Sequence, residues 1–179
     1  GPVSIFTNDV GDKKEKFIDG YLSHFSGNFL FIRGDYQGRH SVPGVGELFI
    51  FQIPLVIFGL YSLIRMKNKS SLFVLLWLLI SPIPAALSIP TPHAGRALFF
   101  VIAWALVSAH GLMFLLKNLK PILLIPLLFV AVYNVVTYFH LYYSHYPKEK
   151  ALDWAGGYKE MSQFVGQNYN NYERIAITR

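Results

Sequence analysis

The chain has 179 residues, of which 53% are hydrophobic and only 15% are charged, and its mean hydropathy of +0.38 is too high for an ordinary soluble domain. The formal net charge of +6 is typical of the lysine and arginine excess in membrane loops, so it does not indicate a nucleic-acid-binding protein. The absence of cysteine excludes disulfides, zinc–thiolate sites and cysteine nucleophiles. Because the apolar residues fall in long blocks, we expect an all-α, polytopic membrane protein.

Residues 1–46 are polar, with acidic and basic side chains interleaved, and we expect an outer loop segment that carries one short amphipathic helix. Between residues 16 and 25 the apolar side chains recur at helical spacing: Phe17, Ile18, Tyr21, Leu22 and Phe25. Their aromatic face would lie either on the membrane interface or on the rest of the protein. Residues 28–33 are predicted to be extended, and glycine-rich turns follow them.

Four apolar runs within residues 47–143 predict membrane-spanning helices over about residues 48–64, 72–89, 97–116 and 121–142. Pro54 lies inside the first run, where it would kink the helix or shift its start. Pro82 and Pro84 predict a bend or break in the second half of the second run. The fourth run ends in an aromatic belt, which is typical of a membrane interface.

The charges of the short loops predict the orientation of these helices. Lysine and arginine are concentrated at residues 65–69 and 117–120, whereas the turn between the second and third runs carries Arg96 alone. The positive-inside rule places the lysine-rich loops in the cytoplasm. The N-terminal segment, the 90–96 turn and the C-terminal tail would then share the outer face of a multi-pass protein of the cell membrane.

Residues 144–179 are expected to start an outer soluble α/β domain that is truncated here. Trp154, Tyr158, Met161 and Val165 follow the spacing of an amphipathic helix, and residues 175–177 begin a β-like run. The chain begins with Gly1-Pro2 and not with methionine, so both ends suggest a piece of a larger protein.

The turn at residues 88–96 is polar and lies between two apolar runs. Thr91 is predicted to cap the next helix, Pro92 suits its first position, and residues 93–96 would fill its first turn. Free backbone N–H groups beside Arg96 would form an anion site at a membrane surface. The alternative is that Arg96 simply extends to the lipid headgroups.

Several cations on the expected outer face form a candidate site for the phosphate of a lipid carrier, because arginine binds phosphate oxygens with two parallel hydrogen bonds. We select Arg96 and Arg39 first, with His93 and His40 beside them; the alternative for Arg39 and Arg33 is a solvated loop charge. The six histidines are not spaced as metal ligands, so no metal site and no cofactor are expected. Asp35 is interpreted as a turn residue and Glu47 as a partner of a helix dipole, so the catalytic residue stays unknown.

Several runs of sequence carry a resemblance to a known family: YLSHFSGNFLFIRGD at residues 21–35, RHSVPG at 39–44 and PHAGR at 92–96. They resemble bacterial membrane glycosyltransferases of the family 39 type, which are related to dolichyl-phosphate-mannose–protein mannosyltransferases. The runs WAGGYKE at residues 154–160 and RIAIT at 174–178 look like the junction to the outer C-terminal domain of those enzymes.

The resemblance implies a GT-C fold, with many spanning helices and an active site on the outer face. Such enzymes transfer a sugar from a polyprenyl-phosphate donor with inversion, and their catalytic base is an aspartate in the first outer loop. This chain would begin after that loop, so it is expected to lack the catalytic aspartate and to hold part of the donor site. The acceptor, a protein or a glycolipid, is not specified.

A second hypothesis is a polytopic protein without enzymatic activity, such as a carrier-lipid flippase or a transporter subunit. The broken second helix and the outer cations would then line a translocation path. A purely structural anchor for the tail is a weaker alternative, because it leaves the polar 90–96 turn unexplained.

Overall fold

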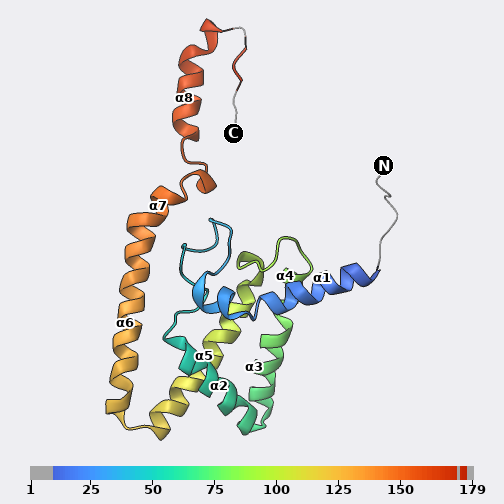
Figure 1. The fold of residues 1–179 in the computed structure, drawn as a ribbon, viewed down its shortest axis with the longest axis vertical. Helices are drawn as coiled ribbons and strands as arrows, with labels where there is room; N and C mark the ends of the chain where they lie inside the picture. Colours follow the sequence, from blue (N-terminus) through green and yellow to red (C-terminus); the bar gives the residue numbers. More distant parts are fainter. Residues whose placement is uncertain (1–9, 173, 177–179) are drawn as a thin grey trace.

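The computed structural model describes residues 10–172 and 174–176, and these residues form helices and turns without a strand (Figure 1). The expected all-α architecture is therefore confirmed. Three helices form the body of the molecule: α2 (Gln52–Met66), α3 (Lys69–Ile80) and α5 (Leu98–Asn118). Helix α1 (Val10–Ser23) lies across one end of this bundle, and α6 (Ile125–His140) runs beside it.

The closest contact of the bundle is the crossing of α2 and α5, which two glycines permit. A Cβ atom at Gly59 would lie 2.0 Å from the Val107 carbonyl oxygen, and one at Gly111 would lie 1.8 Å from the Leu55 carbonyl oxygen. The two backbones therefore touch directly, as they do where small residues line helix contacts in membrane proteins. Around this crossing, the apolar core includes Leu63, Phe100, Trp104 and Val107.

Among the described residues, three helical segments are long and apolar enough to cross a membrane: Lys69–Ala86, Gly95–Asn118 and Pro121–Glu149. They correspond to the second, third and fourth predicted spans. The first predicted span is not shown, because α2 has only 15 residues and is about 22 Å long, against a hydrocarbon core of about 30 Å. Pro54 lies in the first turn of α2, so it marks a late helix start at Gln52 and does not kink the helix.

The predicted break in the second span is confirmed. Helix α3 begins with a capping box, in which the Asn68 side chain accepts a hydrogen bond from the Ser71 backbone N–H at 2.7 Å. It ends at Ile80, and the short helix α4 (Ile83–Ala86) resumes after Ser81 and Pro82. The missing N–H of proline explains why the regular hydrogen-bonding pattern stops at this point.

The amphipathic helix predicted over residues 16–25 corresponds to α1, and its aromatic residues pack on the bundle. The Tyr21 hydroxyl donates a hydrogen bond to the Leu79 carbonyl at 2.7 Å, and the Phe25 ring lies 5.1 Å from that of Phe100. The extended run predicted over residues 28–33 is wrong. Residues Asn28–Ile32 form a π-helical turn, because burial of Phe29 and Leu30 in the core overrides their local preference for extended backbone.

Beyond α6 the chain continues through a π-helical turn (Leu141–His145) and α7 (Tyr146–Glu149) to α8 (Tyr158–Asn168), which projects away from the bundle (Figure 1). Helix α8 confirms the predicted amphipathic helix of the tail. Residues 174–176 are described and are not a strand, and the rest of the predicted β-like run lies outside the described residues. The start of an outer α/β domain is thus not shown.

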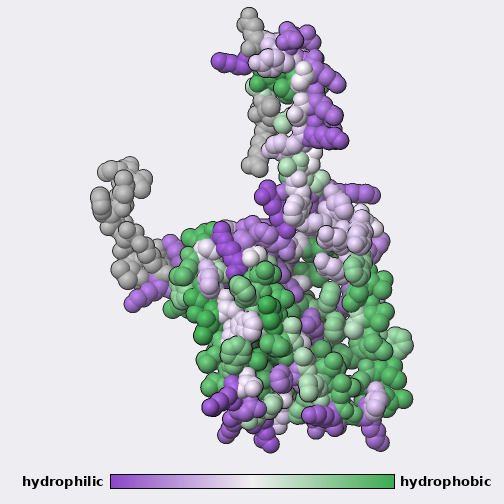
Figure 2. Space-filling view, turned by 180° about the vertical axis from the view of Figure 1, so that it is seen from behind, coloured by the Kyte–Doolittle hydropathy of each residue, from purple (hydrophilic) through white to green (hydrophobic). Residues whose placement is uncertain are grey.

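Polar segments gather at the two ends of an apolar body (Figure 2). The loops with Arg65–Lys69 and Lys117–Lys120 lie at one end, and residues 33–47, residues 87–96 and the tail lie at the other (Figure 1). This grouping agrees with the one predicted from loop charge. The apolar faces between the ends are compatible with contact with a lipid bilayer.

We predict that Gly59→Ala destabilises the bundle by about 2–4 kcal/mol, because the added methyl group has no space beside the Val107 carbonyl. Thermal unfolding of the protein in detergent measures this loss. Gly166→Ala in α8 is the matched control, since nothing lies within 4 Å of its added Cβ and alanine favours a helix by up to about 1 kcal/mol. Equal melting temperatures for the two variants would contradict the close crossing.

Candidate functional site

The buried carboxylate of Asp35 joins the two long loops at the polar end of the bundle. Its Oδ2 atom accepts a hydrogen bond from the Ala94 backbone N–H at 2.8 Å and one from Nδ1 of His40 at 3.1 Å. Its Oδ1 atom accepts the Gln37 N–H at 2.9 Å, which closes a tight turn. The side chain of Asp35 has no exposed surface, so these donors replace the water that the carboxylate lost on folding.

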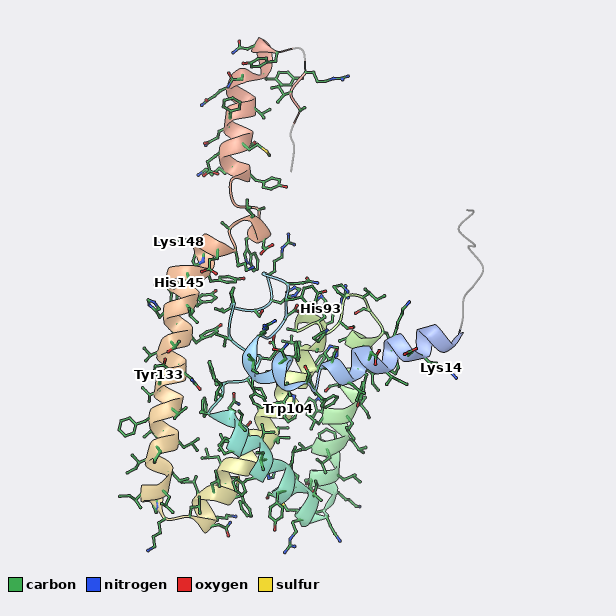
Figure 3. The ribbon with its side chains drawn as sticks, viewed as in Figure 1. Lys14, His93, Trp104, Tyr133, His145 and Lys148 are labelled. Atoms are coloured by element: carbon green, nitrogen blue, oxygen red, sulfur yellow. The ribbon has the colours of Figure 1, made fainter. Side chains whose placement is uncertain are left out.

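His93 and His24 continue this network into the bundle. The Nδ1 atom of His93 lies 3.8 Å from Asp35 Oδ2, and the His93 backbone N–H donates to Nε2 of His24 at 3.2 Å. Nδ1 of the fully buried His24 donates to the Gly20 carbonyl at 2.7 Å, so the ring is the neutral Nδ1–H tautomer. Burial lowers the pKa of His24, and burial together with the nearby Arg96 lowers the pKa of His93. Figure 3 shows His93 at the end of the bundle, above Trp104 of α5.

The two imidazoles of the site face each other. The rings of His40 and His93 lie 4.6 Å apart, and a Cβ atom at Gly95 would be 3.4 Å from the His93 ring and 3.6 Å from the His40 ring. Within the described part of the chain, Asp35, His40 and His93 are a group whose ligand atoms all lie within 4.8 Å of one another. Three ligand atoms at this spacing could hold one metal ion.

Glu47 supports Asp35 from the opposite side. Its Oε1 atom accepts the Asp35 backbone N–H at 2.9 Å, and its surroundings include the apolar side chains of Phe29, Leu48 and Trp104. Burial raises the pKa of the Glu47 carboxyl to about 7, and the negative charge of Asp35 adds to the rise. Glu47 therefore changes its charge near neutral pH.

A groove runs between residues 39–50 and α6, and the cationic side chains of its wall are gathered at one end, which is called the polar end below. It consists of three neighbouring cavities of about 600, 330 and 170 Å³, all of which include Tyr138 in their walls. Arg39, His40 and Lys150 lie at the polar end, whereas the wall of the other end, which includes Ile50 and Tyr133, has no charged side chain. The groove can therefore accept a molecule with a charged head and an apolar chain.

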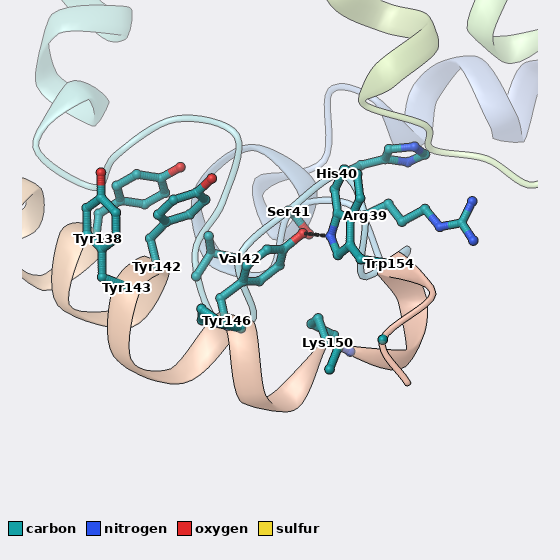
Figure 4. A pocket seen from close by; sticks show the side chains of 13 residues that line it. Arg39, His40, Ser41, Val42, Tyr138, Tyr142, Tyr143, Tyr146, Lys150 and Trp154 are labelled. Carbon is teal, nitrogen blue, oxygen red and sulfur yellow. Dashed lines mark hydrogen bonds between the residues drawn. The ribbon is translucent and has the colours of Figure 1, made fainter. Parts of the chain in front are cut away.

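Aromatic side chains of the α6–α7 region form the wall of the largest cavity (Figure 4). The Tyr146 hydroxyl donates to the Gly38 carbonyl at 2.7 Å and accepts the Trp154 indole N–H at 2.7 Å. Arg39 donates through Nε to the Asp153 carbonyl, and Lys150 lies 3.9 Å from the Asp153 carboxylate. These contacts hold the polar loop against the tail and keep both cations at the rim of the groove.

The helix start predicted at the 88–96 turn is wrong. Helix α5 begins at Leu98, after a short 3₁₀ turn (Gly95–Ala97), and neither segment has a side-chain cap at its N-terminus. Thr91 therefore caps no helix. The free backbone N–H groups of this turn were expected to bind an external anion. In the structure the Ala94 N–H donates to Asp35, and the Arg96 N–H points to Nδ1 of His93 at 3.3 Å. The anion at this turn is a carboxylate of the protein itself.

The predicted site residues divide into three groups in the structure. Arg39 and His40 line the groove, and His93 is buried beside Asp35. Arg96 is exposed, and it lies neither in the groove walls nor in an ion pair with a described acidic residue. No pattern in the sequence pointed to Lys150, and Asp35 was interpreted as a turn residue although it lies at the centre of the site. The short spacing between Asp35 and His40 was the available signal, but spacing within a loop does not show that two side chains are in contact.

Comparisons with protein-family models, curated proteins and solved structures found no match to this chain.

We predict that Glu47→Gln changes how the stability depends on pH. The folded-state pKa of about 7 lies above the ordinary value of 4.5, so the stability linked to neutral Glu47 is fully present below pH 4.5 and is lost as the pH rises through 7. The free energy of unfolding of the natural protein should therefore fall relative to that of the variant between these two pH values, by a difference on the order of 1 kcal/mol, and its melting temperature should fall with it.

The measurement is thermal unfolding in detergent with a chelator present, so that no bound cation alters the local field. Glutamine keeps an oxygen that can accept the Asp35 N–H, which limits the change to the titration. If the melting temperatures of the natural protein and of Glu47→Gln change with pH in the same way across this range, Glu47 does not titrate as described.

Proposed function

We propose that this chain is part of an integral-membrane glycosyltransferase that takes its sugar from a polyprenyl-phosphate donor at the outer face of the cell membrane. The observation that carries the proposal is the groove beside α6, which has cations at its polar end and no charged side chain in the wall of its other end. A polyprenyl phosphate has the same division into a charged head and a long apolar chain.

The phosphate of the donor would lie at the polar end of the groove. Arg39 keeps its terminal guanidinium N–H groups for a phosphate oxygen while its Nε is held by Asp153, and Lys150 adds a second positive charge. His40 would supply a further N–H, whereas Arg96 lies outside the walls of the groove. The isoprenoid chain would follow the uncharged wall past Tyr138 towards Tyr133.

The resemblance of residues 21–44 and 92–96 to family 39 transferases supports the reaction class. In those enzymes the base is an aspartate in an earlier loop, so we assign no catalytic base within this chain. The fixed position of Asp35, held by two backbone N–H groups and one imidazole, suits a structural role. On this proposal, the complete active site requires the preceding part of a longer protein.

We predict that the protein binds polyprenyl phosphate more tightly than the polyprenol of the same length, because only the phosphate engages the cations. Arg39→Ala and Lys150→Ala should each reduce this preference about tenfold, as expected for loss of one charge-assisted hydrogen bond. Binding is measured with the purified protein in nanodiscs. Turnover of a polyprenyl-phosphate hexose by the full-length protein should fall in parallel.

Lys148→Ala is the matched control, since Lys148 is an exposed cation on α7 that does not line the groove (Figure 3). Its affinity and turnover should equal those of the natural protein. Equal binding of the phosphate and the alcohol would overturn the proposed donor site. Tight phosphate binding without sugar transfer by the full-length protein would favour the carrier-lipid flippase instead.

A further inference from the structure

Three side chains with metal-ligating atoms converge where residues 33–47 meet the 87–96 turn. Asp35 Oδ2 lies 3.1 Å from Nδ1 of His40 and 3.8 Å from Nδ1 of His93, and the three ligand atoms all lie within 4.8 Å of one another. Asp35 and His40 come from one loop and His93 from the other, so the cluster exists only in the folded protein.

The spacing of these atoms fits coordination of one ion. Zinc bonds to histidine nitrogen and carboxylate oxygen are about 2.0–2.2 Å long, so two ligands of a tetrahedral site lie about 3.4 Å apart. The observed separations of 3.1 and 3.8 Å lie on either side of that value. We propose that Asp35, His40 and His93 bind a divalent transition-metal ion, with Zn²⁺ as the ion that this two-histidine, one-carboxylate set fits.

A second layer of hydrogen bonds already holds the ligands in place. The Asp35 carboxylate accepts the Gln37 and Ala94 N–H groups, and Glu47 accepts the N–H of Asp35 itself. His24 accepts the backbone N–H of His93 and is in turn anchored to Gly20. Supporting contacts of this kind orient metal ligands and raise the affinity of a site.

The charge of the cluster also favours a cation. The Asp35 side chain is completely buried and carries a negative charge, whereas its hydrogen-bond donors are two amides and one imidazole. The Arg96 N–H points to Nδ1 of His93 at 3.3 Å, which is long for a hydrogen bond, so at His93 a metal ion would displace only a weak contact. At His40 it would replace the hydrogen bond to Asp35 with bonds from both side chains to the ion.

A three-residue site leaves a coordination position for an external ligand, as in catalytic zinc sites. His40 lines the first two cavities of the groove, so it connects the ion site with the polar end of that groove. The ion would also join the two loops, which gives it a structural effect that does not depend on any donor or transferase activity.

The first test is the metal content of the full-length protein, purified in detergent, stripped with EDTA and dialysed against Zn²⁺. We expect about one ion per chain and a higher melting temperature with zinc than with EDTA. His40→Ala and His93→Ala should each weaken zinc binding at least about tenfold. The matched control is His145→Ala, because His145 is a half-exposed histidine 3.7 Å from Glu149 and lies outside the cluster.

The second test gives a spectroscopic signature that does not depend on stability. The chain has no cysteine, so His40→Cys introduces a single thiol at the half-buried edge of the cluster. With Co²⁺ in place of Zn²⁺, this variant should show a thiolate-to-cobalt charge-transfer band in the near ultraviolet. His145→Cys should show none at the same cobalt concentration.

Zinc bound by the natural protein and by the His145 variant, together with the cobalt–thiolate band of the His40→Cys variant, would establish the site. The proposal is overturned if the natural protein retains no zinc above the buffer level. It is also overturned if His40→Ala and His93→Ala retain zinc as tightly as His145→Ala does. Neither outcome depends on a glycosyl donor, so the proposed transferase function is tested separately.

Discussion

The polar end of this molecule depends on the compensation of one buried charge. The Asp35 carboxylate has no contact with water, and a charge in that position must be paired or hydrogen-bonded for the fold to be stable. Its partners come from the following turn and from Ala94, which is 59 residues later in the chain. The conformation of both loops is therefore tied to one side chain, and removal of the carboxylate would leave three donors without their acceptor.

The apolar part of the molecule follows a different constraint, which is how closely the helices approach. Gly59 and Gly111 bring α2 and α5 into backbone contact, and the core forms around this crossing. Helix α6 has no such contact. It meets the rest through Phe51, whose N–H donates to Asn134 at 3.2 Å, and through the Phe49 and Tyr138 rings at 5.7 Å. Because α6 has no close crossing like that of Gly59 and Gly111, it packs more loosely, and the groove stays open along its length.

The sequence predicts well those features that depend on local patterns. Long apolar runs identify three segments that can cross a membrane, and the proline pair after Ser81 locates the break in the second of them. Local rules fail where distant residues decide the structure. Residues Asn28–Ile32 are helical because the core buries Phe29 and Leu30. Thr91 has the right residue type for a helix cap, but Asp35 takes the free N–H of Ala94 and the helix begins later. No pattern within one loop could show that contact.

In the sequence, the cations and the carboxylates of the polar end are interpreted separately. In the structure they lie close together, so each affects what the other can bind. A lipid phosphate at Arg39 and Lys150 would lie near His40, and thus near the negative charge of Asp35 and, as the pH rises through about 7, that of Glu47. Without a counter-charge, these carboxylates would oppose the binding of an anion. A divalent cation held by Asp35, His40 and His93 would reverse the sign of the local potential. Phosphate and metal would then each increase the affinity of the site for the other, because coupling between two ligands is reciprocal. The buried aspartate would in this way connect the stability of the two loops with recognition in the groove.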